Sequence, residues 1–286
     1  MAEVWFGTRN YMQWISAPSV DVGASKRGFS GQVGFLSGGA YVRRSKAAAK
    51  TFAMSWGVRT RAQVQPILDY ADGVYGNGPL YYCNPFAMPL NMLPAYWASP
   101  SINYYDGPAI VDGIRPELVT NLTSTNGYPV ESAIYALTSS SSIPSIYLPI
   151  PPGYTMHIGA HGSVVSGTAS VTVTPEVNAI SSGPTSNLTL LDTTTTTRTN
   201  FTVEGDSYAG VTISMASLSS GQIQLDGLIA QCLPNSATPT LGGFISGQGQ
   251  SGLSFVEQPT VSEYSYAFDR VGVSADLIET EAWLWA

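Results

Sequence analysis

The chain has few charged residues, and even fewer cysteines and histidines. Lys, Arg, Asp and Glu make up 11 % of its 286 residues, less than half the ~25 % of an average globular protein. Cys83 and Cys232 are far apart and match no metal or redox spacing, so we interpret them as buried small hydrophobic residues. His157 and His161 have no Cys, Asp or Glu close in sequence to complete a metal site. We therefore expect neither a bound metal nor a cofactor.

Catalytic motifs are also missing from the sequence. There is no G-x-S-x-G element, no phosphate-binding glycine loop that opens a helix, and no convincing order of Ser, His and Asp. The glycine-rich stretch GGFISGQGQSG lies among predicted strands, where a hairpin loop is the ordinary interpretation. The carboxylates are scattered along the chain. This pattern argues against an enzyme, and we assign no catalytic residue.

The uncharged run Gly73–Tyr105 is not a membrane span. It contains PLYYCNPFAMPLNMLPAYWASP, residues 79–100, in which prolines recur every four to six residues. Each proline removes a backbone donor, whereas a spanning helix must pair its backbone groups internally. We call this segment the arm and predict that it is extended and irregular. It is held by packing, either against its own domain or against a neighbouring subunit.

Turn-forming residues are abundant, and they punctuate many short apolar runs. Gly, Ser, Thr, Asn and Pro occur beside plentiful aromatic and β-branched residues, which is typical of a turn-rich β protein. From about residue 116 onward, ten runs of four to eight residues are separated by Ser, Gly and Thr turns. This spacing predicts an antiparallel β-sandwich or jelly roll.

The preceding part of the chain is also predicted to be β-rich, with one short helix. Phe52, Met54 and Trp56 alternate within KTFAMSW and predict a half-buried strand. A helix is predicted to follow, because Thr60 and Gln63 have the spacing of a capping box and a glycine at position 73 provides a stop.

The charges divide the chain into two parts. Residues 1–120 carry ten basic and seven acidic side chains, a net of +3, and residues 121–286 carry two basic and twelve acidic ones, a net of −10. This asymmetry indicates two domains with different partners, which we assign to residues 1–115 and 116–286. All eight charges from Lys26 to Arg61 are positive, but no nucleic-acid motif accompanies them. We expect this stretch to dock on an acidic protein surface through Arg43, Arg44, Lys46 and Lys50.

Several segments resemble minor tail proteins of long-tailed phages that infect actinobacteria. They are GGAYVRRS, FAMSWG, DYADGVYGNGPLYYCNPFAMPLNMLPAYWASP, ISGQGQSGLSFV and SADLIETEAWLWA, and the pieces Asn91–Pro94 and Trp97–Pro100 are the most specific. Where that family has a Glu-Val-Gly turn near the C-terminus, this chain has ETEAW. The resemblance implies a distal-tail-like protein of the tail tip or baseplate. Its N-terminal β domain would form a ring below the tail tube, and its C-terminal sandwich, similar to galectins or carbohydrate-binding modules, would project outward.

The resemblance also implies the partners and the location. The protein would assemble with itself into a symmetric ring, expected to be a hexamer, and contact the tail tube protein, the tape measure and other tail-tip proteins. Genomic DNA would pass through the ring. The N-terminus MAEVWFGTRN has no basic region followed by an apolar core, so we expect synthesis and assembly in the host cytoplasm and residence in the virion. The arm residues predicted to form the interface are Tyr81, Tyr82, Phe86, Met88, Leu90, Met92, Leu93, Tyr96 and Trp97.

An alternative function is a carbohydrate-binding module that attaches the virion to the host cell wall. The C-terminal segment ADLIETEAWLWA is relevant to it. If it forms one unbulged strand, Ile278, Ala282 and Leu284 point toward the core, and Leu277 points the other way. The outward face would then bind a sugar or pack against the first domain or an adjacent subunit. It comprises Glu279, Glu281, Trp283 and Trp285.

Overall fold

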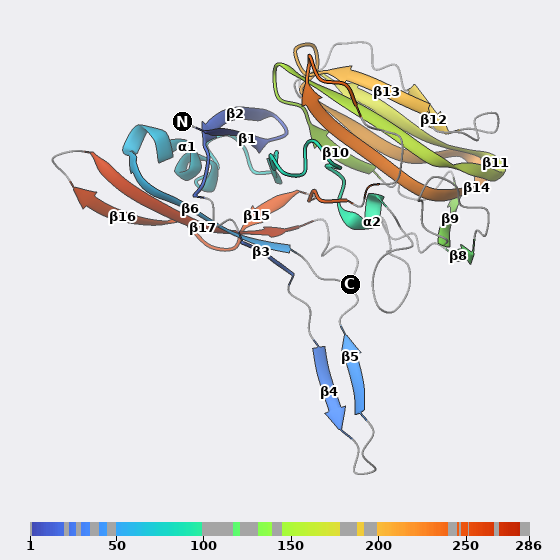
Figure 1. Cartoon of the computed structure of the whole chain (residues 1–286), viewed down its shortest axis with the longest axis horizontal. Helices are drawn as coiled ribbons and strands as arrows, with labels where there is room; N and C mark the ends of the chain where they lie inside the picture. The colour runs from blue at the N-terminus through green and yellow to red at the C-terminus, as the bar shows by residue number, and fades with distance from the viewer. Residues whose placement is uncertain are drawn as a thin grey trace.

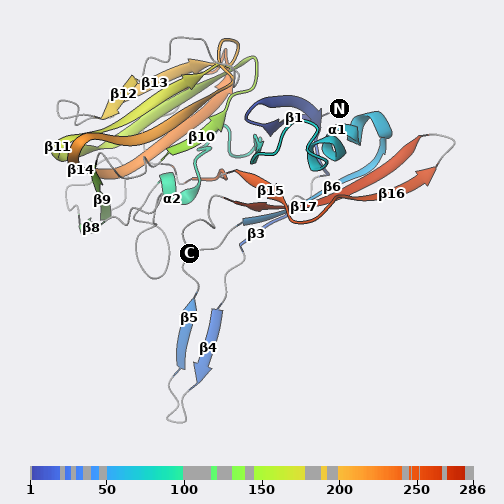
Figure 2. The ribbon, with the colours of Figure 1, turned by 180° about the vertical axis from the view of Figure 1, so that it is seen from behind.

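Two antiparallel β-sheet units account for most of the chain, as Figures 1 and 2 show from opposite sides. The structure is a computed structural model. It describes residues 2–19, 23–26, 30–34, 40–44, 50–98, 117–120, 131–138, 145–177, 188–191, 199–239, 245, 247–250, 252–265 and 269–280.

The first unit, which we call the N-terminal sheet, has eight strands. Their order is β2-β1-β7-β15-β17-β6-β3, and β16 also pairs with β17. The strands are β1 (Glu3–Thr8), β2 (Tyr11–Ser16), β3 (Gly23–Lys26), β6 (Lys50–Thr60), β7 (Leu80–Tyr82), β15 (Leu253–Phe255), β16 (Thr260–Ser265) and β17 (Arg270–Glu279).

The last described strands, β15, β16 and β17, therefore lie in the sheet of the first strands, which departs from the predicted domain boundary. The sequence places residues 253–280 in the sandwich, whereas β17 pairs with β6 and β15 pairs with β7. The physical reason is the shared core: Val271, Val273 and Leu277 on β17 are buried in the same cluster as Phe52 on β6. Pairing between strands about 200 residues apart leaves no local signal in the sequence.

Helix α1 (Arg61–Ala71) begins and ends where the sequence predicts. Thr60 is the N-cap and forms a capping box with Gln63, whose Oε1 accepts the backbone N–H of Thr60 at 3.0 Å. Gly73 adopts a φ of 73°, which glycine tolerates best. Its N–H and that of Val74 donate to carbonyls of the last helical turn, which forms a Schellman motif.

The helix packs on the strand that the alternating pattern predicts. Phe52, Met54 and Trp56 on β6 are all buried, in one cluster with Val64 and Ile67 of α1. The predicted strand and its buried face are confirmed, so the alternation within β6 does define the core face of this sheet.

The second unit is an antiparallel β-sandwich, as predicted. Its strand order is β12-β11-β14-β9-β8, with β10 also on β14 and β13 also on β11. The apolar side chains of these strands form one buried cluster. The strands are β8 (Glu117–Thr120), β9 (Glu131–Thr138), β10 (Ser145–Pro149), β11 (Tyr154–Glu176), β12 (Leu188–Leu191), β13 (Thr199–Glu204) and β14 (Gly210–Pro234).

Strands β11 and β14 are much longer than the short runs that the sequence predicts. The Gly and Ser residues after His161 suggest a turn, but β11 continues through them with three register shifts against β14 between His161 and Ala169. Gly167 has a φ of 71°, and a Cβ there would overlap the backbone of Ser220. These glycines therefore permit bulges within one strand rather than ending it.

The remaining described elements are two strands and a short helix. Strands β4 (Ser30–Gly34) and β5 (Ala40–Arg44) form a separate two-stranded sheet, and this hairpin projects away from both units in Figures 1 and 2. The short helix α2 (Ala95–Ala98) contacts β14. No helix in the described ranges is long and apolar enough to cross a membrane.

Replacing Tyr135 by phenylalanine is expected to raise the free energy of unfolding by up to about 1 kcal/mol. Tyr135 is fully buried in the sandwich core, its hydroxyl has no partner within the described residues, and burial raises its pKa. The substitution removes an unpaired polar atom and keeps the ring. Chemical denaturation measures the effect. Tyr70→Phe is the control, since it loses a hydroxyl 3.1 Å from the Tyr11 carbonyl and should reduce stability. A loss for Tyr135→Phe would contradict the argument.

Candidate assembly surface

The arm is largely an internal part of its own chain. Most of the arm side chains that were predicted to form an interface are buried within this chain. This agrees with the alternative prediction, in which the arm packs against its own domain and not against a neighbouring subunit. The side chain of Tyr96 is not among those that the structure describes. The buried residues are Tyr81, Tyr82, Met88, Met92, Leu93 and Trp97.

Asn91 fixes the centre of the arm. It is fully buried, and its Nδ2 donates to the carbonyls of Leu228 and Ile245 at 3.0 and 2.9 Å. Its Oδ1 accepts the backbone N–H groups of Ala230 and Leu93 at 3.0 and 3.2 Å. All four hydrogen-bonding positions of the amide are thus satisfied. The side chain replaces backbone pairing that an irregular, proline-rich segment cannot supply.

Backbone hydrogen bonds attach the arm on two sides. On one side, the N–H of Met92 donates to Ala230 and the N–H of Cys232 donates to Met88, both at 2.8 Å, so the arm follows the edge of β14. On the other side, the N–H of Gly249 donates to Leu93 at 3.1 Å. The arm therefore lies between β14 and residues 247–250, and links the N-terminal sheet to the sandwich.

Two predicted interface residues of the arm remain exposed. Phe86 is 80 % exposed and Leu90 is 45 % exposed. They lie on a tight turn, in which the carbonyl of Asn84 accepts the N–H groups of Ala87 and Met88 at 3.0 Å, and the Asn84 Oδ1 accepts the N–H of Phe86 at 3.0 Å. Among the described residues of the arm, this ordered turn, which presents an apolar ring to solvent, is the part available to a partner.

The predicted basic surface falls on the projecting hairpin and its flanks. Arg43 and Arg44 lie on β5, opposite Gly31 and Ser30 of β4, and Lys50 begins β6. Lys46 lies outside the described residues. The backbone thus places two of the four predicted cations on a hairpin that, among the described strands, pairs with neither sheet.

The predicted C-terminal patch requires a correction. Glu279 is only 2 % exposed and Leu277 is fully buried, whereas Ile278 is partly exposed. The buried face of β17 is therefore the face that the sequence analysis directs outward. The reason is that β17 lies between β15 and β6, and its odd-numbered side chains face the core of the N-terminal sheet. The other members, Glu281, Trp283 and Trp285, lie outside the described residues, as do Ala282 and Leu284.

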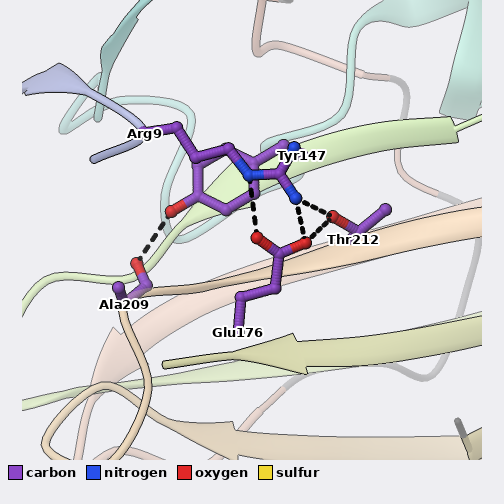
Figure 3. Close-up of polar contacts among 5 residues, drawn as sticks. All are labelled: Arg9, Tyr147, Glu176, Ala209 and Thr212. Carbon is purple, nitrogen blue, oxygen red and sulfur yellow. Dashed lines mark hydrogen bonds and ion pairs between the residues drawn. The ribbon is translucent and has the colours of Figure 1, made fainter. Parts of the chain in front are cut away.

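A polar junction between the two units, shown in Figure 3, was not predicted from the sequence. Arg9, in the turn between β1 and β2, reaches Glu176 at the end of β11 through Nε at 2.8 Å and through Nη2. The same Nη2 is 3.4 Å from the Thr212 hydroxyl, which also donates to Glu176. The guanidinium lies 4.8 Å from the ring centre of Tyr147. This arrangement combines a bidentate ion pair with a cation–π contact.

Aromatic contacts also join segments of the two units. Tyr147 on β10 meets Tyr81 of β7 edge-on, with ring centres 4.8 Å apart, and its hydroxyl donates to the carbonyl of Ala209 at 3.3 Å. The ring centres of Trp14 on β2 and Tyr154 on β11 are 6.4 Å apart. Nothing in the local sequence signals these contacts, because each joins segments that are far apart in the chain.

The histidines do not form a metal site in the described ranges, where no cluster of three potential ligands occurs. The Nδ1 of His161 lies 2.6 Å from Asp226 Oδ2, and Asp226 Oδ1 also accepts from Gln224 Nε2 at 3.2 Å. Asp226 is 65 residues away in sequence from His161, so this pair was also missed. His157 is buried, and neither of its ring nitrogens has a hydrogen-bond partner within the described residues.

His157 predicts an acid-sensitive contribution to stability. Burial lowers its pKa below the ordinary value, so the folded protein resists taking up a proton that the unfolded chain accepts below about pH 6.5. The free energy of unfolding should therefore fall as the pH drops below that value. Denaturation between pH 7.5 and pH 5 should show a shallower loss for His157→Leu than for the wild type. Parallel curves would show that His157 does not contribute.

Both cysteines are buried free thiols, which confirms the sequence interpretation. Burial raises the pKa of Cys83 and raises that of Cys232 to about 12. Because the thiolate is the reactive form, these residues act as core side chains where the arm meets β14.

Comparison with known proteins gives only weak structural similarities. No family model and no curated protein matches the chain. A xylan-binding domain, CBM22-1 of Paenibacillus barcinonensis Xyn10C, is 10 % identical with a TM-score of 0.35, and the match covers 49 % of this chain and 94 % of that domain. The enzymatically active domain of bacteriophage CBA120 tailspike protein 4 is 9 % identical with a TM-score of 0.31, covering 50 % and 22 %. The infectious bursal disease virus VP2 particle protein is 9 % identical with a TM-score of 0.26, covering 93 % and 83 %.

Proposed function

We propose that the chain is a structural protein of a phage tail tip, similar to distal-tail proteins, which forms a ring between the tail tube and the tip complex. The hairpin β4–β5 is the observation that carries an assembly role. It pairs with no other described strand and projects from the rest of the chain (Figure 1). An isolated two-stranded hairpin is only marginally stable in water, so a neighbouring molecule would complete its packing.

Charge supports a protein partner for this hairpin. The eight charges from Lys26 to Arg61 are all positive, whereas residues 121–286 have a net charge of −10. Opposite potentials steer association and favour the correct partner. The partners in this proposal are further copies of the chain, the tail tube protein, the tape measure and other tail-tip proteins. The location is the virion, and genomic DNA passes through the ring without specific contact.

Reversing two charges on the hairpin tests the proposal. Arg43→Glu with Arg44→Glu should prevent tail assembly while the purified protein remains folded, because β4 and β5 pair only with each other among the described strands. Electron microscopy of phage particles measures assembly, and circular dichroism checks the fold. Arg270→Glu is the control, since Arg270 is exposed and lies outside the positive stretch from Lys26 to Arg61. If the double variant assembles normal tails, the hairpin is exposed to solvent in the tail and the proposed contact is wrong.

A second candidate is a carbohydrate-binding adhesion module, and it rests on the sandwich architecture of residues 117–234. Folds of this class serve many functions, so the fold supports the candidate only as a class. The predicted sugar patch gives it less support than expected, because Glu279 is buried.

Co-sedimentation of the full chain with actinobacterial cell walls distinguishes the two candidates. A structural ring protein should remain in the supernatant. If the wild-type chain instead sediments with the cell walls, and the double variant Trp283→Ala with Trp285→Ala does not, the result would favour adhesion.

A further inference from the structure

The contact between Arg9 and Glu176 joins two units that also meet through the arm and through the ring contact of Trp14 with Tyr154. We propose that these two residues form a latch, which holds the sandwich in one orientation relative to the N-terminal sheet. When the latch is removed, the sandwich turns about the arm. This inference is independent of any role in a phage tail.

The geometry of the latch restricts orientation in more than one direction. The planar guanidinium meets Glu176 through Nε and Nη2, and a two-point contact fixes the relative angle of the two groups. The ring of Tyr147, 4.8 Å from the guanidinium, limits movement perpendicular to that plane. The two groups that Arg9 contacts are themselves held in place. The Thr212 hydroxyl donates to the Glu176 carboxylate, and the Tyr147 hydroxyl donates to the carbonyl of Ala209.

The latch controls orientation more than it controls global stability. The Arg9 side chain is 47 % exposed and that of Glu176 is 18 % exposed, and ion pairs with this degree of solvent contact contribute little to folding. By contrast, the arm is attached through the fully buried Asn91 and through backbone hydrogen bonds to β14. Loss of the latch therefore leaves the arm attached as a pivot.

Double electron–electron resonance can measure the orientation in the full chain. Spin labels at Val74→Cys and Val165→Cys occupy exposed positions on the N-terminal unit and the sandwich, respectively. Cys83 and Cys232 are both buried and resist labelling. The otherwise unsubstituted protein should give one narrow distance distribution. Arg9→Ala and Glu176→Ala should each broaden it or add a second maximum.

Three comparisons separate a latch from general damage. Arg9→Lys keeps the charge but not the two-point contact, so it should give an intermediate distribution. Arg61→Ala removes an exposed ion pair between helix α1 and strand β16 and should leave the distribution narrow. Denaturation midpoints should stay near the wild-type value for all these variants. An unchanged distribution in Arg9→Ala and Glu176→Ala, or a broad one in the parent protein, would overturn the proposal.

Discussion

Replacing Asn91 by alanine should lower the free energy of unfolding by about 4 kcal/mol, because four hydrogen bonds are lost and each buried group left unpaired costs about 1–3 kcal/mol before relaxation. The groups are the carbonyls of Leu228 and Ile245 and the N–H groups of Ala230 and Leu93. Equilibrium denaturation in urea measures the loss.

Two variants control for this result. Asn84→Ala removes the same side chain from the same arm, but Asn84 makes one exposed side-chain bond, to the N–H of Phe86, so a loss of at most about 1 kcal/mol is expected. Asn91→Asp keeps the acceptor and turns a carboxylate oxygen toward the two carbonyls that Nδ2 contacts. It should destabilise at least as much as alanine. If Asn91→Ala costs no more than Asn84→Ala, the arm is not fixed by this amide.

Gly249→Ala should destabilise by about 3 kcal/mol or prevent folding, as overpacking of a tight site does. A Cβ at this position would overlap the carbonyl group of Met92, and the N–H of Gly249 donates to Leu93 at 3.1 Å. The arm and residues 247–250 would have to separate to admit one methyl group.

The matched control for Gly249→Ala is Gly78→Ala. No atom lies within 4 Å of a Cβ built there, so the change should stay within about 0.5 kcal/mol. Thermal and chemical denaturation of both variants gives the comparison. Equal stability of the two would mean that the arm is not tightly packed against residues 247–250.

Local patterns predicted local structure well in this chain. The capping box of Thr60 and Gln63, the helix end at Gly73 and the buried face of β6 all depend on residues within a few positions of one another. The sandwich class followed from the frequency of strands and turns. Each of these features is determined by nearby sequence, so a single chain suffices to find it.

Features that depend on distant pairing were not predictable in this way. Arg9 and Glu176 are 167 residues apart in sequence. Strand β17 pairs with β6 although all strands of the sandwich lie between them in the sequence. Leu277, Ile278 and Glu279 show a further limit. Both faces of β17 carry apolar side chains, and the carboxylate of Glu279 suggested an outward face although it is buried. Charge was a poor guide because Ser274 and Asp276 occupy the exposed face of β17, whereas Glu279 lies on the opposite, buried face.

The arm illustrates the same division. Its irregular, extended character follows from its prolines, but the sequence left two partners open for its apolar side chains. The structure places Met88, Met92, Leu93 and Trp97 in the core of the same chain and leaves Phe86 and Leu90 exposed. Among the described residues of the arm, a self-assembly role is therefore confined to the turn that carries these two residues.

Mass photometry of the purified full chain tests the central claim most directly, which is that this protein assembles with itself. We predict a closed oligomer, with the mass of a hexamer as the expected value, alongside dissociated subunits at low concentration. Phage tails should contain the same protein at the tip. A strictly monomeric protein that is also absent from purified virions would contradict the account.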